Sequence, residues 1–295
     1  MRLEYIAPTS VDEALERLQA AGGRAALAAG GTDLIPALRA EARQVDLVID
    51  LGRLAGEGAR YSTIRLEQGT LCLGAGVTHT QVIESALVQQ HLPALAAACA
   101  EIGGPPVRNR GTLGGNLANA SPAADSAPPL LAYDAGLLLV SPAGERRVAL
   151  QDFFLGPRRT LLKPDELILE IGVPLPPAAT AASFIKLGRR SAMAIAVVSA
   201  AARLSLDESG RVSQARLALG SVAPIPLRAF AAEQALQGQE LQPALLQAAA
   251  ELARQAVQPI SDVRASAEYR SRMVEVLSRR ALHTAWEALQ RRDPA

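Results

Sequence analysis

Two glycine-rich segments constrain the fold of this chain more than any other feature of its sequence. The first is Ala-Gly-Gly-Thr-Asp at residues 29–33, which follows an apolar stretch and precedes a short helical pattern at residues 34–39. Adjacent glycines lack Cβ atoms, so the backbone can turn tightly and its N–H groups can approach a phosphate. The segment matches neither G-x-G-x-x-G nor the P-loop. This motif alone therefore does not distinguish a phosphate-binding site from a simple tight turn.

The second segment lies within residues 103–129, a run rich in Gly, Pro and Asn that is predicted to lack secondary structure of its own. Such long loops are uncommon in compact domains and are usually functional. Its glycine, hydroxyl and amide donors suit a diphosphate, and the acceptor-only carboxylate of Asp125 suits a ribose hydroxyl. This segment alone is also compatible with a lid or a linker. Two such loops in one chain favour a dinucleotide that lies between two subdomains.

Hydrophobic periodicity predicts an α+β chain with three regions. Residues 1–57 read as a βαβ unit, with strands at 3–6, 25–29 and 45–51 and a helix that starts at the capping box of Ser10 and Glu13. Residues 58–176 read as strands at 63–67, 70–74, 137–140, 147–150 and 167–173, with helices around 81–88 and 92–101. Residues 177–290 read as strands at 183–187, 196–206 and 211–219, followed by helices at 228–237, 242–257 and 265–289.

Composition and charge exclude several classes of partner. The net charge is +1 and no long basic run occurs, so nucleic acid is not an expected partner. The N-terminus lacks the pattern of a signal peptide, and no stretch of ~18 apolar residues could span a membrane, so we expect a cytoplasmic location. Cys72 and Cys99 sit among apolar neighbours, and two thiols cannot hold an iron-sulfur cluster that normally needs four. The three histidines are scattered, so no metal site is expected.

The two loops resemble those of the FAD-binding medium subunit of the xanthine dehydrogenase and carbon monoxide dehydrogenase family. Ala-Gly-Gly-Thr-Asp-Leu at 29–34 is similar to the first pyrophosphate loop of that family. Arg-Asn-Arg-Gly-Thr-Leu-Gly-Gly-Asn at 108–116 and Ala-Ser-Pro-Ala-Ala-Asp at 120–125 are similar to its second. The resemblance continues through residues 164–168 and 184–190, and it ends at Asp-Val-Arg-Ala-Ser-Ala-Glu-Tyr-Arg at 262–270. Nearly the whole chain is covered.

The resemblance implies non-covalent FAD and a set of residues around it. Those expected to surround the diphosphate are Ala28, Ala29, Gly30, Gly31, Thr32, Asp33, Thr112, Gly114, Gly115 and Asn116. Asp125 is expected near the ribose or adenine, and Ile168, Lys186 and Ile195 by the isoalloxazine ring or its surroundings. No catalytic residue is expected, because a flavin performs the redox chemistry itself.

The implied fold is a small parallel βαβ subdomain, an antiparallel-sheet subdomain, and a C-terminal domain of three antiparallel strands and helices. The implied role is electron transfer from the clusters of a [2Fe-2S] small subunit to an external acceptor. A molybdopterin large subunit completes the complex, and the expected assembly is a dimer of heterotrimers. Molybdopterin and the clusters are expected only in these partners, where the organic substrate is also selected.

Other interpretations stay open from the residues alone. A self-sufficient FAD-dependent oxidase or reductase, or a non-catalytic scaffold, would also account for the glycine loops. The chain lacks the cysteine-bearing loop of 4-hydroxybenzoyl-CoA reductase flavin subunits, which disfavours that role. Ser191, Ala192 and Met193 replace acidic residues found in xanthine dehydrogenase, which disfavours NAD as the acceptor and leaves a quinone, a cytochrome or oxygen open. On the last helix, four arginines are predicted to form a solvated face: Arg270, Arg272, Arg279 and Arg280.

Overall fold

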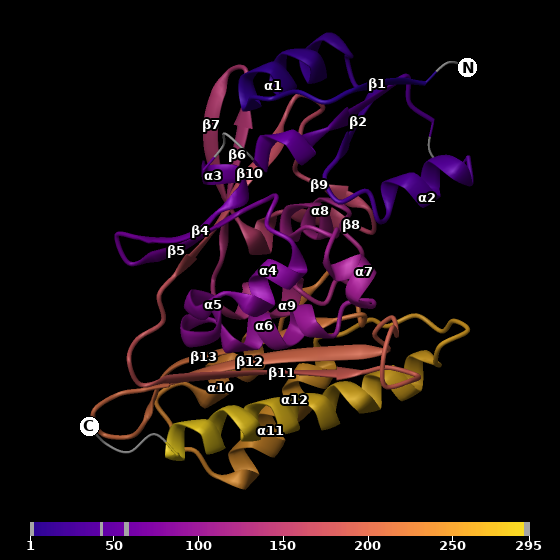
Figure 1. Ribbon diagram of the computed structural model, residues 1–295. Coiled ribbons are helices and arrows are strands. Elements are labelled where there is room, and N and C mark those ends of the chain that lie inside the picture. The colour runs from indigo at the N-terminus through magenta and orange to yellow at the C-terminus, as the bar shows by residue number, and fades with distance from the viewer. Residues whose placement is uncertain (1–2, 42–43, 56–58, 292–295) are drawn as a thin grey trace.

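Three larger sheets, one two-stranded sheet and the helices packed on them make up the described part of the fold (Figure 1). The computed structural model describes residues 3–41, 44–55 and 59–291. A parallel three-stranded sheet lies at one end, a five-stranded antiparallel sheet in the middle, and a four-stranded antiparallel sheet at the other end. The α+β class and the nature of the first two sheets are confirmed.

The first sheet is a βαβ unit with the strand order β1-β3-β2, and all its pairs are parallel. Its elements are β1 (Glu4–Ile6), α1 (Val11–Ala20), β2 (Ala25–Ala28), α2 (Leu34–Arg39) and β3 (Leu47–Asp50). Ser10 caps α1 as predicted, since its Oγ accepts a hydrogen bond from the Glu13 N–H at 3.2 Å. The Glu13 carboxylate accepts from the Thr9 N–H rather than closing the box on Ser10. The short η1 (Leu51–Ala55) and α3 (Ala59–Ser62) follow β3.

The middle sheet has the order β4-β5-β10-β6-β7, with β10 at its centre. Its strands are β4 (Ile64–Glu67), β5 (Thr70–Gly74), β6 (Gly136–Ser141), β7 (Gly144–Ala149) and β10 (Leu167–Pro174). Between β5 and β6 the chain forms α4 (His79–Glu84), α5 (Ala86–His91) and α6 (Pro93–Ala100). The single helix predicted around residues 81–88 is wrong, because Ser85 ends α4 in an extended conformation and caps α5 through the Val88 N–H.

The segment at residues 103–129 is not the structureless loop that its composition predicts. It contains α7 (Pro105–Arg108), α8 (Leu113–Ala118) and the first part of α9 (Ala127–Ala132). Proline is favoured in the first turn of a helix, and α7 and α9 both carry prolines there. A two-stranded hairpin follows the middle sheet's β7, made of β8 (Phe154–Gly156) and β9 (Arg159–Thr160) after η2 (Leu150–Asp152).

The C-terminal sheet runs β11-β12-β13-β14 and is antiparallel throughout. Its strands are β11 (Thr180–Leu187), β12 (Val198–Leu206), β13 (Val212–Gly220) and the two-residue β14 (Leu227–Arg228), which the sequence did not predict. Helices α6 and α9 pack on one face of this sheet (Figure 1). The other face is covered by α10 (Phe230–Leu236), α11 (Pro243–Gln255) and α12 (Ala267–Gln290).

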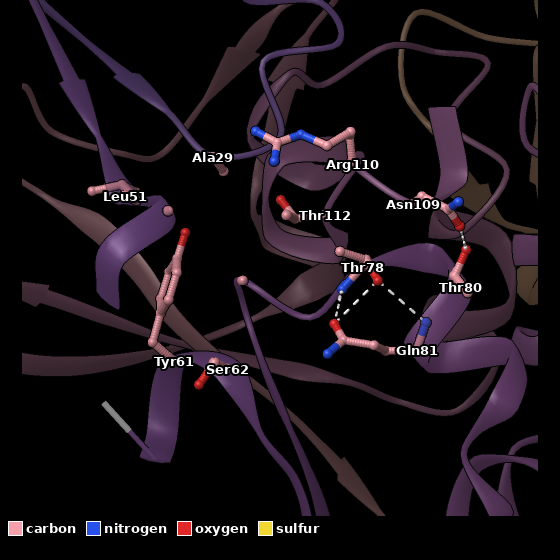
Figure 2. Close-up of a pocket in the computed structure, with 12 residues that line it drawn as sticks. Ala29, Leu51, Tyr61, Ser62, Thr78, Thr80, Gln81, Asn109, Arg110 and Thr112 are labelled. Carbon is pink, nitrogen blue, oxygen red and sulfur yellow. Dashed lines mark hydrogen bonds between the residues drawn. The ribbon is translucent and has the colours of Figure 1, made fainter. Parts of the chain in front are cut away.

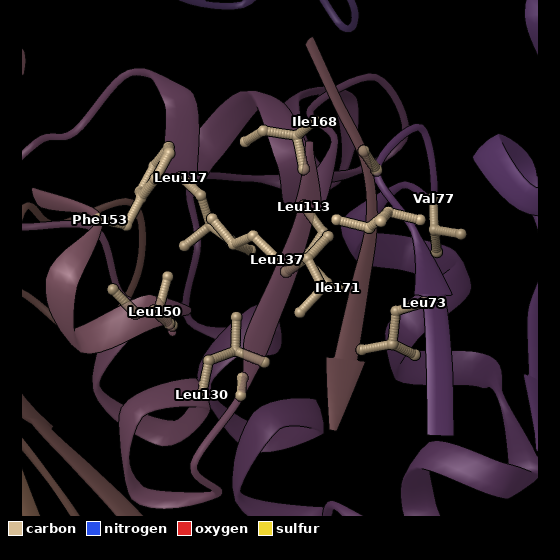
Figure 3. Close-up of a cluster of buried hydrophobic side chains, with 14 of the residues drawn as sticks. Leu73, Val77, Leu113, Leu117, Leu130, Leu137, Leu150, Phe153, Ile168 and Ile171 are labelled. Carbon is tan, nitrogen blue, oxygen red and sulfur yellow. The ribbon is translucent and has the colours of Figure 1, made fainter. Parts of the chain in front are cut away.

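Two hydrophobic cores follow from this layering. One joins the βαβ unit, the middle sheet and the helices α4, α5, α6, α8 and α9, and Figure 3 shows Leu113 and Leu117 of α8 packed against Leu137 and Ile171 of the middle sheet. The other lies between the C-terminal sheet and α10–α12. Both cysteines are free and buried, in agreement with their apolar neighbours in the sequence. Among the described residues, no helix is long and apolar enough to cross a membrane.

Arg270 contradicts the predicted solvated face of α12. It is only 2% exposed, and its guanidinium donates to the carbonyl oxygens of Val197 and Ser221 and to the Asp262 carboxylate. A buried arginine is stable when such acceptors satisfy it, and periodicity alone does not reveal them. Arg272 does lie at the surface, where it pairs with Glu268 one turn earlier.

Candidate functional site

A cavity of about 410 Å³ lies between the βαβ unit and the part of the chain that follows β5 (Figure 2). This volume is within the range of small-molecule and cofactor sites. The lining residues come from both glycine-rich segments, from η1 and α3, and from the chain that leads into α4: Ala29, Leu51, Gly52, Tyr61, Ser62, Gly76, Thr78, Thr80, Gln81, Asn109, Arg110 and Thr112. The two loops singled out from the sequence therefore meet at one cavity.

The first glycine loop is pressed against the second. A Cβ atom on Gly30 would lie 2.0 Å from the Arg110 carbonyl oxygen and 2.8 Å from the Gly111 Cα, so only glycine fits there. Gly31 has φ +73°, a conformation that glycine adopts without strain. Within the described residues, the backbone N–H groups of residues 30–33 have no hydrogen-bond acceptor. The loop thus carries free donors beside the cavity, as an anion site requires.

The second glycine pair has a different role from the one its donors suggested. The N–H of Gly114 donates to the Ala75 carbonyl at 2.9 Å, and that of Gly115 donates to Thr112 Oγ1 at 3.1 Å. Both groups are therefore used within the chain. A Cβ atom on Gly114 would lie 2.5 Å from that of Ala75, so this glycine allows α8 to pack closely on the chain after β5. Thr112, which caps α8, lines the cavity itself.

The carboxylate of Asp125 forms an ion pair with Lys186 near a second cavity. The Lys186 Nζ donates to Asp125 Oδ2 at 2.7 Å and to the Glu101 carbonyl oxygen at 2.9 Å. The side chains of Lys186 and Asp125 are only 3% and 8% exposed. Lys186 and Glu101 line this second cavity of about 330 Å³, together with the chain that follows β11. The structure thus joins two residues that were expected at different parts of the cofactor.

Burial changes the proton affinity of this pair. Desolvation raises the pKa of Asp125 to about 6, although the Lys186 ammonium opposes the shift and the Glu101 carboxylate adds to it. The Oδ1 atom of Asp125 is buried and has no hydrogen-bond partner among the described residues. An unsatisfied buried carboxylate oxygen indicates a site that a ligand or a proton completes.

Hydrogen bonding connects the second loop to this ion pair. Asn116 Oδ1 accepts from the Ser126 hydroxyl at 2.6 Å, and Ser126 is adjacent to Asp125 in the chain. The structure does not bring Ile168 or Ile195 to either cavity. Ile168 is 6% exposed in the core beside β6, whereas Ile195 is 59% exposed on the chain after β11.

The remaining predicted residues of the first loop occupy distinct positions. Ala28 ends β2 and pairs with Asp50, while Ala29 lines the first cavity. Thr32 is partly exposed, and Asp33 precedes α2 without a side-chain hydrogen bond to cap it. Their contact with FAD stays a prediction.

Several residues of the first cavity were not predicted from the sequence. The ring of Tyr61 is 4% exposed and packs below Gly76, where an added Cβ would lie 2.3 Å from it. The Arg110 guanidinium extends toward Ala29 in Figure 2 and has no partner among the described residues. Thr78 and Gln81 form a complete capping box at the start of α4, and the Thr-x-x-Gln pattern was a signal that could have identified this turn.

This arrangement defines a class of protein. A parallel βαβ unit faces a second subdomain across a cavity, and the two glycine-rich segments approach the cavity from both sides. The first segment carries the free N–H donors, and the second carries the cationic side chain of Arg110. Such a site suits the diphosphate of a dinucleotide, and the fit is supported by the close backbone approach at Gly30 and by the Arg110 side chain that lines the cavity.

Comparison with known proteins identifies the family. Residues 1–176 match the model of the FAD binding domain in molybdopterin dehydrogenase, and residues 183–285 match that of the CO dehydrogenase flavoprotein C-terminal domain. The chain belongs to the family of FAD-binding medium subunits of molybdopterin dehydrogenases. It is a subunit of an oxidoreductase complex of the molybdenum hydroxylase class.

Individual relatives support the same assignment. The xanthine dehydrogenase FAD-binding subunit of Escherichia coli O157:H7 is 38% identical over 263 residues, which cover 89% of each chain. The carbon monoxide dehydrogenase medium chain of Hydrogenophaga pseudoflava is 36% identical and covers 97% of each chain. A solved structure of carbon monoxide dehydrogenase from Hydrogenophaga pseudoflava, in a form without the Mo-pyranopterin moiety of its cofactor, has a TM-score of 0.92 at 38% identity. That match covers 97% of this chain and 98% of the other.

Proposed function

We propose that this chain holds FAD non-covalently and transfers electrons from the [2Fe-2S] clusters of a partner subunit to an external acceptor. The observation that carries the proposal is the first cavity, where both glycine loops meet beside free backbone donors and Arg110. Bound FAD would supply the redox chemistry, while the protein supplies position and electrostatics. No side chain is assigned as a general acid or a nucleophile.

The residues around the two cavities would divide the work of holding the cofactor. The N–H groups of residues 30–33 and the Arg110 guanidinium carry the positive potential that a diphosphate needs. Asp125 accepts hydrogen bonds only and would repel a phosphate, so it suits a ribose hydroxyl or the uncharged edge of a ring. Lys186 places a positive charge at the same point, which would favour a reduced, anionic flavin.

The proposal extends to organisation and partners. We assign residues 1–57 and 58–176 to the two FAD-binding subdomains and residues 177–290 to the C-terminal domain. The partners are a [2Fe-2S] small subunit and a molybdopterin large subunit, in a dimer of heterotrimers. The medium-chain relative of carbon monoxide dehydrogenase supports membership in a larger complex. The organic substrate would be selected by the molybdenum subunit, and this chain would contact the final acceptor.

An absorbance spectrum of the purified full chain tests the cofactor assignment. We expect a flavin spectrum, and chromatography of the flavin released on denaturation should identify FAD at one per chain. The variant Arg110→Glu places a negative charge at the rim of the first cavity and should lose most of the FAD. The matched control Arg272→Glu changes an exposed arginine of α12 and should keep it. A colourless protein that takes up no added FAD would overturn the proposal.

The proposed electron transfer from a partner subunit needs a second experiment. The chain is co-expressed with the genes that neighbour its own and is purified by a tag on this chain. The proposal predicts that these genes encode a cysteine-rich protein and a large protein. We expect both partners to co-purify, and the FAD absorbance to bleach when the substrate of the molybdenum subunit is added. An FAD-loaded chain that is reduced directly by a small organic substrate, without partners, would instead identify a self-sufficient flavoenzyme.

A further inference from the structure

The ion pair of Asp125 and Lys186 is built to gain a proton. The Lys186 ammonium uses two of its three N–H donors, because it donates to Asp125 Oδ2 at 2.7 Å and to the Glu101 carbonyl at 2.9 Å. The Asp125 carboxylate is only half used, since its Oδ1 atom is buried and has no partner among the described residues. A proton on Oδ1 would leave the ion-pair hydrogen bond from Lys186 to Oδ2 in place.

Few other charged or titratable groups face this pair. Lys186 comes from β11, and the end of α6 contributes Glu101 and the buried Cys99, whose thiol pKa is raised by burial. The guanidinium of Arg190 lines the same cavity, and it donates to the carbonyl oxygen of Met193. Asp125 is therefore the buried carboxyl closest to Lys186, with Glu101 as a more exposed negative neighbour.

The proton affinity of Asp125 is poised near neutrality. Burial raises its pKa to about 6, so the carboxylate is mostly ionised in the resting protein at pH 7. Negative charge that arrives nearby in a water-poor site would raise this pKa further, because like charges disfavour each other's ionised forms. A flavin held beside Lys186 brings such charge each time it is reduced.

We propose that Asp125 is the proton-accepting residue of the flavin site and takes up one proton for every two electrons that enter. Two electrons from the reductant and one solvent proton reach the flavin, and a second solvent proton binds Asp125 Oδ1. Two negative and two positive charges enter, so the net charge of the site does not change. On reoxidation by the acceptor, Asp125 releases its proton. This inference rests on the proposed function, because it needs FAD bound with its ring near Lys186.

The midpoint potential of the bound FAD reports this proton directly. For a two-electron couple, each proton taken up changes the potential by about 30 mV for every tenfold change in proton concentration. Two protons per two electrons therefore give a slope of about 60 mV per pH unit, and one proton gives about 30 mV. A purely structural ion pair would not affect this slope.

The test is a reductive titration of the full FAD-loaded chain with dithionite and a redox dye, between pH 6.5 and 8. We expect a slope near 60 mV per pH unit for the wild type and near 30 mV for Asp125→Asn, which cannot take up the proton. The control Asp152→Asn changes an exposed aspartate outside both cavities and should keep the wild-type slope. A wild-type slope near 30 mV, or an unchanged slope in Asp125→Asn, would overturn the inference.

Infrared spectroscopy keeps the inference testable if Asp125→Asn does not fold or loses its FAD. A reduced-minus-oxidised difference spectrum of the wild type should show the carbonyl band of a protonated carboxylic acid. This band should shift when the protein is made with aspartate labelled with carbon-13 at the carboxyl group. The absence of such an aspartic acid band contradicts the inference. A chain that binds no FAD gives neither signal and overturns the proposed function, whereas an FAD-loaded chain with the wrong slope overturns this inference alone.

Discussion

Gly30 lies directly against the backbone of Arg110, so that a Cβ atom at residue 30 would come within 2.0 Å of the Arg110 carbonyl oxygen. The two residues belong to different glycine loops and are far apart in the sequence. Their contact joins the loops into one wall beside the first cavity, and the absence of a side chain at residue 30 makes that contact possible. The geometry of the cavity therefore depends on this one position.

Replacement of Gly30 by alanine should separate the two loops. Because the contacted atoms are backbone, neither can move aside cheaply, and we expect the variant to lose about 1–3 kcal/mol of stability. FAD affinity should fall at least tenfold, measured by quenching of flavin fluorescence on titration of the protein. The control Gly136→Ala adds a Cβ atom at an ordinary distance of 3.6 Å from the Val148 carbonyl and should bind FAD normally. Equal affinity in Gly30→Ala and the wild type would show that the loop contact does not shape the site.

Thr112 links helix formation to the cavity, because it caps α8 and also lines the cavity. In Thr112→Val the Gly115 N–H loses its acceptor, so we expect a loss of about 1 kcal/mol in the free energy of unfolding. Thr112→Ser keeps the hydroxyl and should retain the wild-type value. Urea denaturation of the FAD-free proteins measures the difference. A valine variant as stable as the serine variant would mean that the cap contributes nothing.

The sequence predicted those parts of the fold that depend on local patterns. The βαβ unit, the strands of the middle sheet and the hairpin between β12 and β13 follow from periodicity and turn residues, and α2 was predicted with its observed bounds. Glycine pairs identified both loops of the site. The second glycine pair, however, has a different role from the one predicted. Gly114 allows α8 to pack on Ala75 instead of presenting a free N–H.

Features that depend on contacts between residues far apart in the chain could not be predicted from the sequence. Arg270 resembles any surface arginine of a helix until Val197, Ser221 and Asp262 are seen around its guanidinium. Tyr61 gave no local signal, because its place at the cavity depends on the close approach of Gly76. The pairing of Asp125 with Lys186 joins residues 61 positions apart on different elements. Only the resemblance to a known family had placed both near the cofactor.

Asp134 connects the middle region of the chain to the C-terminal sheet. It follows α9, and its carboxylate accepts hydrogen bonds from Arg203, Arg216 and Arg228, at distances between 2.7 and 3.0 Å. Asp134→Asn leaves the buried Arg203 without its counter-charge. The backbone should not be strained by this change, because asparagine tolerates the positive φ of 55° at this position. Because Asp134 is one-third exposed, we expect a loss of about 2 kcal/mol rather than the larger cost of breaking a fully buried pair.

A surface pair provides the comparison for Asp134. The carboxylate of Asp46 lies 3.3 Å from Arg24, and both side chains are about half exposed or more. Asp46→Asn should therefore cost less than about 1 kcal/mol. Thermal and urea denaturation of both variants measure the difference. If the two variants are equally stable, the arginine cluster does not hold the C-terminal sheet in place.

Asp262 should make stability depend on acid pH. Burial alone would raise its pKa, but hydrogen bonds from Arg264 and the ion pair with Arg270 outweigh that effect and hold the pKa well below its usual range. A carboxyl group whose pKa is lower in the folded state stabilises the protein above its unfolded pKa of about 3.9, and this contribution is lost as the pH falls through that value and below. Asp262→Asn should therefore be less stable than the wild type by about 2 kcal/mol at pH 7, and the difference should shrink between pH 4 and pH 2.

Urea denaturation at pH 7, 5, 4 and 3 measures this convergence. The control Asp12→Asn changes an exposed residue in the first turn of α1, and its difference from the wild type should stay small at every pH. Arg270→Met removes the other partner of the ion pair and should destabilise the protein at pH 7. The difference should be smaller at pH 3, because the unfolded wild-type chain then binds a proton at Asp262 that the folded protein does not, and the wild type loses this part of its stability. A constant difference between Asp262→Asn and the wild type down to pH 3 would mean that Asp262 acts through packing and not through its charge.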